Sequence, residues 1–140
     1  MKAVVKFEGK KIEISAKANG THYSENKYGG GTVNQFKITL SYDGRSTSFD
    51  FFDSIYNYNQ GKKLLLESEL PWCLYCFISD ALAGQMSFDD FMGEFGYEDW
   101  KEGKRVWKAC GKMSDKYDDL FDDDFDIYDF INYIQETYEC

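Results

Sequence analysis

The sequence has little of what defines a membrane protein, a secreted protein or an enzyme built around histidine. No apolar run approaches the roughly 20 residues that a membrane-spanning helix needs, and no long apolar stretch follows Met1-Lys2 as it would in a signal peptide. The chain holds one histidine, one proline and four cysteines among its 140 residues. We therefore expect a cytoplasmic protein that does not contact a membrane and whose cysteines stay reduced.

Basic residues are scarce as well. The 16 Lys and Arg face 25 Asp and Glu, so the net charge is −9. Generic binding of nucleic acid needs a basic surface, so this balance argues against direct contact with nucleic acid and favours a basic partner. The imbalance lies at the end of the chain, where residues 114–140 hold ten acids and only Lys116 as a base. Aromatic and aliphatic side chains alternate with these acids, so we expect the segment to fold.

The hydrophobic pattern of residues 1–56 predicts mainly strands. Apolar side chains alternate at Phe36, Ile38 and Leu40, which is the period of a half-buried strand. Asp43-Gly44 is a strong signal for a two-residue hairpin turn. Residues 18–34 are rich in Gly, Asn, Ser and Thr and are expected to form a loop. We predict an antiparallel sheet of three or four strands.

Residues 68–140 predict mainly helices. Pro71 suits a first helical turn, Ser87 suits an N-cap, and Gly96 suits a helix stop. The expected helices cover about 72–83, 87–96, 100–121 and 126–139, and the last is expected to bury Tyr128, Ile131, Ile134 and Tyr138. A sheet followed by about four helices is an α+β fold, and the length predicts a single domain over residues 1–140.

Two constellations resemble reactive sites but fit a structural role better. Cys73 and Cys76 form a CxxC pair, yet no second pair completes a zinc site. Acidic residues precede the pair where a redox motif needs positive charge, so we expect both thiols in the core. His22 lies in the predicted loop without a nucleophile motif. We therefore assign no catalytic residue and no cofactor, and we do not expect an enzyme.

Asp122, Asp124 and Asp126 have the alternate spacing that opens a calcium-binding EF-hand loop. That loop also needs Gly at its sixth and Glu at its twelfth position, and the chain has Ile127 and Tyr133 there. No metal ligand is therefore assigned. Weak binding of a divalent ion by the clustered carboxylates stays open as an alternative.

The acidic segment is the best candidate for a functional surface. If residues 118–129 formed one helix, their seven aspartates would give one charge per about 2.5 Å, against one per about 1.7 Å in duplex DNA. Such a surface resembles a phosphate backbone, although a solvated face that only aids solubility is the plainer interpretation. The candidate partner-binding residues are Asp115, Asp118, Asp119, Asp122, Asp123, Asp124, Asp126 and Asp129.

Four segments resemble a group of small uncharacterised proteins of bacteriophages and prophages. They are Ser48–Tyr56, Gly61–Lys63, Ser87–Tyr97 and Lys104–Cys110, in the order strand, linker, helix and basic helix. The chain departs from that group at Met92, where cysteine is common, and in its aspartate-rich end. The resemblance implies an origin in a mobile element and assigns no functional residue. Small acidic phage proteins often resemble inhibitors of host defence, such as anti-CRISPR and anti-restriction proteins.

These observations favour a phage-encoded inhibitor in the cytoplasm of the host cell. Its aspartates would imitate DNA phosphates in a basic groove of a host defence nuclease or CRISPR effector, without binding nucleic acid directly. Two alternatives stay open. One is a protein that binds a divalent metal ion, and the other is a structural or regulatory phage protein that contacts its partner through Phe49 and Phe51 or through the basic helix Lys101–Lys108.

Overall fold

The computed structural model describes residues 1–26, 29–53 and 65–138. It confirms the α+β class, because an antiparallel sheet of four strands precedes four α-helices in these residues. The chain divides into two compact units, Met1–Cys73 and Leu74–Cys140. Each unit is described by itself.

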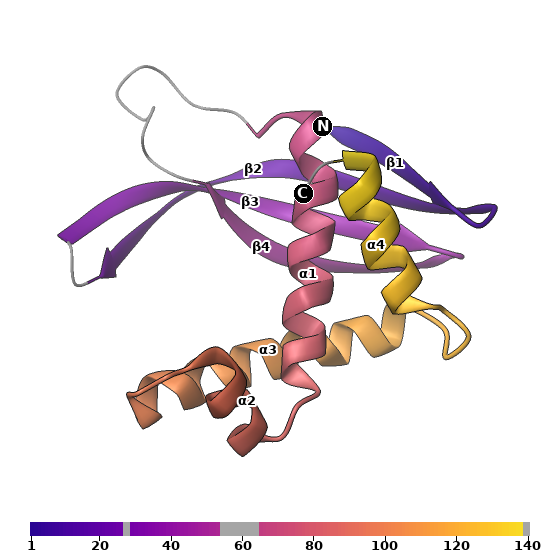
Figure 1. The fold of residues 1–140 in the computed structure, drawn as a ribbon. Coiled ribbons are helices and arrows are strands. Elements are labelled where there is room, and N and C mark those ends of the chain that lie inside the picture. The colour runs from indigo at the N-terminus through magenta and orange to yellow at the C-terminus, as the bar shows by residue number, and fades with distance from the viewer. Residues whose placement is uncertain (27–28, 54–64, 139–140) are drawn as a thin grey trace. The chain divides into compact units, whose positions relative to one another are not determined.

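The first unit contains one sheet in which each strand pairs with the next along the chain (Figure 1). The strands are β1 (Lys2–Phe7), β2 (Lys10–Asn26), β3 (Gly29–Tyr42) and β4 (Arg45–Asp53). Tight turns at Glu8-Gly9 and Asp43-Gly44 have positive φ at both residues, as a type I′ hairpin turn requires. The hairpin predicted at Asp43-Gly44 is therefore confirmed.

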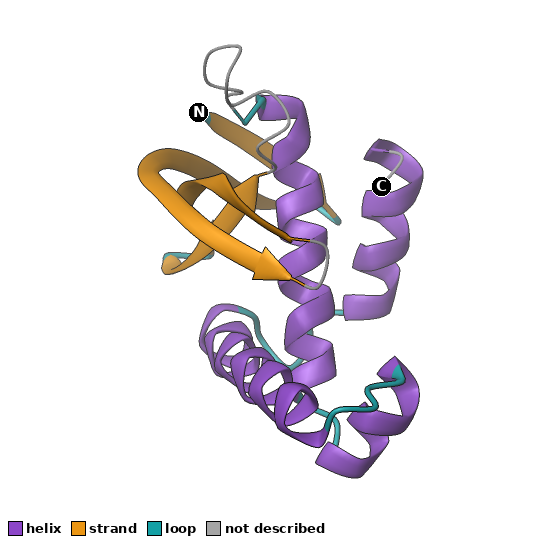
Figure 2. Ribbon diagram, turned by 90° about the vertical axis from the view of Figure 1, so that its left-hand side faces the viewer, coloured by secondary structure: helices purple, strands orange, loops and turns teal. Residues whose placement is uncertain are grey.

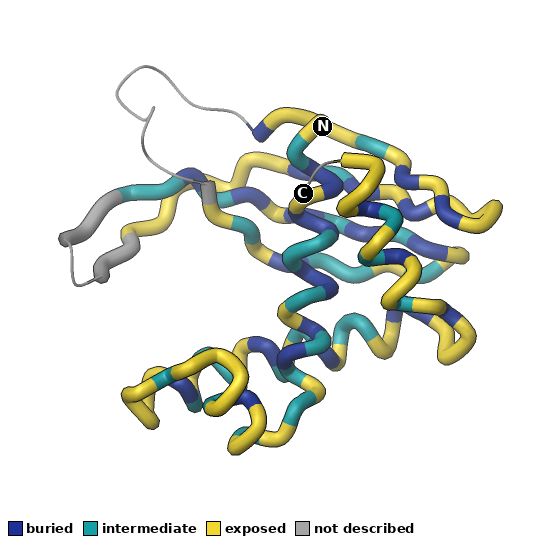
Figure 3. The backbone as a smooth tube through the Cα atoms, viewed as in Figure 1, coloured by how far each residue is buried: buried dark blue, intermediate teal, exposed yellow. Residues whose placement is uncertain are grey.

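One face of the sheet is buried. The register places Ile14 opposite Leu40, and Ile38 opposite Phe49, so apolar side chains meet across neighbouring strands and stabilise the pairing. Buried residues alternate with more exposed ones along β1, β2 and β3 (Figure 3). The buried set in the strands is Val5, Phe7, Ile12, Ile14, Ala16, Phe36, Ile38, Leu40, Tyr42 and Phe49.

The prediction of a loop over residues 18–34 is wrong in the part that the structure describes. β2 continues to Asn26 and β3 begins at Gly29, and the two pair along this length with a register shift between Ala18 and Thr21. Gly20 lies at the shift with a φ of 76°, where a bulge needs the freedom of glycine. Backbone hydrogen bonds can pair two strands whatever their side chains are, so the polar composition alone did not reveal these strands.

Four helices follow, and their ends match the local signals in the sequence (Figure 2). Ser87 Oγ accepts a hydrogen bond from the Asp90 N–H at 3.2 Å, and Gly96 ends the same helix with a φ of 64°. The helices are α1 (Leu70–Gly84), α2 (Phe88–Phe95), α3 (Trp100–Leu120) and α4 (Ile127–Tyr138), with a short 3-10 turn η2 (Glu67–Glu69) before α1. Among the described helices, none has the length and apolarity needed to cross a membrane.

Two glycines allow helices of the second unit to approach closely. A Cβ on Gly84, at the end of α1, would collide with the backbone carbonyl of Cys110 in α3. A Cβ on Gly103 in α3 would collide with the Met92 side chain of α2. The backbone of α3 is therefore held against both neighbours, and this fixes the helix that leads to the acidic segment.

The predicted inner face of α4 needs a correction. Tyr128 is 71% exposed and Tyr138 is also exposed, whereas Phe130 and Ile134 are fully buried. A tyrosine keeps its hydroxyl in water unless a partner is available inside, so the phenylalanine takes the core position. The buried face of α4 is thus centred on Phe130 and Ile134.

Candidate protein-binding surface at the α3–α4 connection

The eight aspartates predicted to bind a partner lie on one continuous stretch of the second unit, which we call the acidic corner. Asp115, Asp118 and Asp119 belong to the last turns of α3, and Asp129 belongs to the first turn of α4. The other four lie in the connection between the helices. All eight are exposed, and Lys116 is the only base among residues 115–129, so this stretch carries −7.

A stack of phenylalanines supports the acidic corner from within. Phe121 lies 4.3 Å from Phe125, and Phe125 lies 5.1 Å from Phe130, measured between ring centroids. All three side chains are buried, and offset or edge-on aromatic pairs of this kind add about 0.5–1.5 kcal/mol beyond their buried area. The connection that displays the acids is therefore anchored at both ends and in its middle.

Backbone hydrogen bonds define the path between the two helices. The Phe121 N–H donates to the Tyr117 carbonyl at 2.9 Å and closes α3. The Phe125 N–H donates to the Asp122 carbonyl at 3.0 Å, which forms a turn. Asp126 then begins α4, because its Oδ1 accepts from the Asp129 N–H at 3.1 Å in the manner of an N-cap.

The break between α3 and α4 changes the charge geometry that the sequence indicated. The spacing of about 2.5 Å per charge applies to an unbroken helix over residues 118–129, and the structure has a turn there instead. Aspartate is a poor helix former, and the buried Phe121 and Phe125 must turn toward each other to stack. The acids are still dense, but they do not follow one straight line of charge.

Like charges in the acidic corner raise the pKa of neighbouring groups. The neighbouring carboxylate of Asp126 is the main cause that raises the pKa of Asp129. Burial, followed by the charge of Asp118, raises the pKa of Tyr117 to about 12. Asp118 and Asp119 also lie at the C-terminal end of α3, where the helix macrodipole is already negative. The fold therefore tolerates several unfavourable charge contacts.

The described residues contain no group of three or more His, Cys, Asp and Glu side chains placed to hold a metal ion. All eight aspartates of the acidic corner belong to these residues. Calcium takes six to eight oxygen ligands, and these described aspartates do not form even a group of three. The alternative of a divalent metal site thus receives no support from the geometry.

The cysteines fit the core role that the sequence predicted. Cys73 and Cys110 are buried and Cys76 is half-buried, and none of these three described cysteines is in a disulfide. Burial, with a contribution from Asp80, raises the pKa of Cys110, which disfavours the reactive thiolate. His22 is not in a loop as predicted but on β2, with its ring 4.7 Å from that of Phe52.

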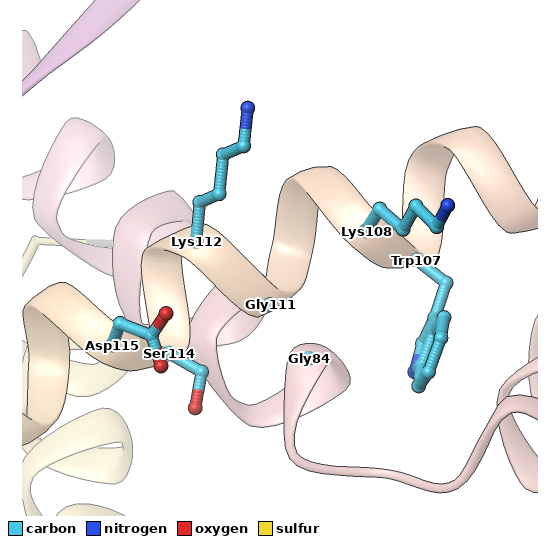
Figure 4. Close-up of a pocket in the computed structure, with 7 residues that line it drawn as sticks. All are labelled: Gly84, Trp107, Lys108, Gly111, Lys112, Ser114 and Asp115. Carbon is cyan, nitrogen blue, oxygen red and sulfur yellow. The ribbon is translucent and has the colours of Figure 1, made fainter.

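A shallow pocket, which the sequence did not predict, lies beside α3. Its volume is about 340 Å³. In Figure 4 the Trp107 ring lies on the same side of α3 as Gly84, whereas Lys112 projects to the opposite side. The Trp107 indole N–H donates to the Met86 carbonyl at 3.0 Å, so that donor is already used. The lining residues are Gly84, Trp107, Lys108, Gly111, Lys112, Ser114 and Asp115.

Comparison with known proteins adds no assignment to this geometry. No protein-family model matches the chain, and no curated protein and no solved structure matches it either. The functional argument therefore rests on the acidic corner and its surroundings.

Proposed function

We propose that this protein is a phage-encoded inhibitor of a host defence system that targets nucleic acid. The acidic corner would occupy a basic groove of a defence nuclease or CRISPR effector and exclude the DNA or RNA that the groove binds. One observation carries this proposal: eight exposed aspartates lie along the end of α3, the connection and the start of α4, and buried phenylalanines hold this stretch in place. The phage setting comes from the resemblance in the sequence.

The rigid support of the acidic corner favours binding over mere solubility. A solvated acidic face needs no fixed geometry, whereas an imitation of phosphates gains affinity when its charges are already in position. The buried stack of Phe121, Phe125 and Phe130 supplies that support. Charge complementarity with a basic groove would also speed association and make it depend on ionic strength.

The direct test is a variant that removes charge from the acidic corner and preserves its shape. In the variant Asp122→Asn, Asp123→Asn, Asp124→Asn and Asp126→Asn, the amide at residue 126 still caps α4, because Asn and Asp are equivalent N-caps. We expect this variant to lose inhibition of the sensitive effector and to bind it at least about tenfold more weakly, which corresponds to about 1.4 kcal/mol. The readouts are plating of a targeted phage on cells with active CRISPR or restriction systems, and competition with labelled target DNA for the purified effector.

A matched control changes the net charge by the same amount elsewhere in the second unit. Asp89→Asn, Asp90→Asn, Glu94→Gln and Glu98→Gln affect exposed residues in and after α2. We expect this variant to inhibit like the parent. Equal inhibition by the parent and by the acidic-corner variant would refute the proposal. If the acidic-corner variant and the control variant lost inhibition equally, the inhibition would be a general effect of net charge.

A further inference from the structure

The exposed face of the sheet has a charge opposite to that of the whole chain. On this outer face, side chains alternate with the buried set, and the register brings five lysines and two acids together. All seven are exposed, so the face carries a net charge of +3 on a chain of −9. The residues are Lys2, Lys6, Lys11, Lys17, Lys37, Glu13 and Asp50.

Four of these lysines form two cross-strand pairs of like charge. Lys6 lies opposite Lys11, and Lys17 lies opposite Lys37. Like charges in directly opposed positions destabilise a sheet, although Asp50 on the other side of Lys37 compensates in part. The two pairs are six residues apart along β2, which is about 20 Å in a strand. An extended polyanion would relieve the repulsion at both pairs.

Hydroxyl groups occupy the sheet between the two lysine pairs. Ser15 lies opposite Thr39, and Thr39 lies opposite Ser48, with 3.2 Å between the Thr39 and Ser48 hydroxyl oxygens. Lys2 and Glu13, on the same face of the sheet, form an ion pair with 3.4 Å between nitrogen and oxygen. Hydroxyls are common donors to phosphate and sugar oxygens, so the surface between the lysines is polar and suited to an anionic backbone.

An aromatic pair lies next to one of the lysine pairs on the same face. Phe52 follows Asp50 by two residues on β4 and is therefore on the outer face, where it is 46% exposed. Its ring contacts that of His22, which is also exposed, with 4.7 Å between the centroids. Gln35 is opposite Phe52 and lies two residues from Lys37 on β3, so the Phe52 ring is a diagonal neighbour of Lys37.

We propose that the outer face binds single-stranded nucleic acid. The two lysine pairs would contact phosphates at two separate points of the strand, and an unpaired base would stack on the Phe52–His22 pair. Basic residues combined with exposed aromatic rings are the usual means of binding single strands. A duplex keeps its bases stacked inside and cannot use the rings, and an acidic polysaccharide has no base to stack. The inference goes beyond the proposed function, because it uses no residue of the acidic corner. It also departs from the expectation, drawn from the net charge of −9, that the chain does not contact nucleic acid directly.

The test measures binding of labelled oligonucleotides of about 12 residues, in DNA and RNA, by fluorescence anisotropy at about 50 mM salt. We expect the double variant Lys17→Glu and Lys37→Glu to bind at least about tenfold more weakly. Phe52→Ala should also weaken binding, by about tenfold, through lost stacking, and Phe52→Tyr should retain it. The matched control is Lys108→Glu and Lys112→Glu on α3, which makes the same change in net charge outside the sheet and should bind like the parent.

Several outcomes would overturn this proposal. No binding of either oligonucleotide at low salt would do so, as would an equal loss of affinity in the α3 control. Duplex DNA or heparin competing as well as the single strand, with no effect of Phe52→Ala, would assign the face to polyanions in general. The acidic-corner Asn variant should still bind single strands, so failure here and failure of the proposed inhibition are separate results.

Discussion

Asp126 is a single residue with two opposing effects on the start of α4. Its carboxylate caps the helix by accepting from the Asp129 N–H, and its charge repels the Asp129 carboxylate and raises the pKa of that group. A cap of this kind contributes about 1 kcal/mol. The sequence placed the start of this helix near Asp126, but it gave the residue only a role in the charged surface. The structural role could have been inferred from an Asp that precedes an apolar helical pattern.

Separating the two effects of Asp126 needs two substitutions. Asp126→Ala removes both the cap and the charge, and we expect it to lower the free energy of unfolding by about 1 kcal/mol. Asp126→Asn keeps the cap and removes the charge, so it should be at least as stable as the parent at neutral pH. Urea unfolding followed by circular dichroism measures both. If the two variants were equally destabilised, the side chain would not act as a cap.

Asp126→Asn also has a defined consequence for the titration of the Asp129 carboxyl group. A raised pKa means that the folded state holds the Asp129 proton more tightly than the unfolded chain does. The stability from this group is therefore present at low pH and is lost as pH rises through the folded pKa. In Asp126→Asn the main cause of the shift is absent, and an NMR titration of the Asp129 carboxyl carbon should give a lower pKa than in the parent.

At the scale of elements, the helices were more predictable than the strands. The ends of α2 follow from Ser87 and Gly96, and α3 follows from an apolar stripe with three- and four-residue steps. The long pairing of β2 with β3 was missed, because Gly and Asn side chains carry no strand signal while their backbones still form the ladder. The lysine pairs of the outer face were missed for a related reason, since only the register shows which strand residues lie opposite each other.

The contact of α1 with α3 gives a prediction at this scale. Gly84→Ala would place a methyl group against the Cys110 carbonyl, and a backbone carbonyl cannot move aside without shifting α3. We expect a loss of about 1–3 kcal/mol in the free energy of unfolding. Gly111→Ala on α3 is the control, because nothing lies within 4 Å of its Cβ, and it should stabilise the helix by about 0.5–1 kcal/mol. If Gly84→Ala left the free energy of unfolding unchanged, the two helices would not be in backbone contact.

At the scale of the whole molecule, most of the charge imbalance is confined to one stretch of chain. Residues 115–129 carry −7 of the total −9, while the outer face of the sheet is positive. Composition alone showed the first of these facts and concealed the second, because net charge averages over surfaces that the fold separates. The net charge of the chain therefore describes neither surface.

This uneven distribution predicts how salt affects stability. Raising NaCl from about 0.01 to 0.15 M shortens the Debye length from about 30 to 8 Å, which screens the repulsion within the acidic corner. We expect the melting temperature to rise by about 2–4 °C. The acidic-corner Asn variant should show a smaller rise in the same calorimetric series. A rise of equal size in both proteins would locate the repulsion elsewhere.

The order of charges along α3 has a consequence for the way the molecule meets its partners. Residues 100–110 of α3 carry a net charge of +3 and residues 111–120 carry −1, so the side-chain charges add to the macrodipole of the helix instead of cancelling it. Such a helix is a permanent electric dipole. In the field of a basic groove it would turn its aspartate end forward before contact, so that ionic strength changes mainly how often collisions succeed and has less effect on how long the bound pair persists.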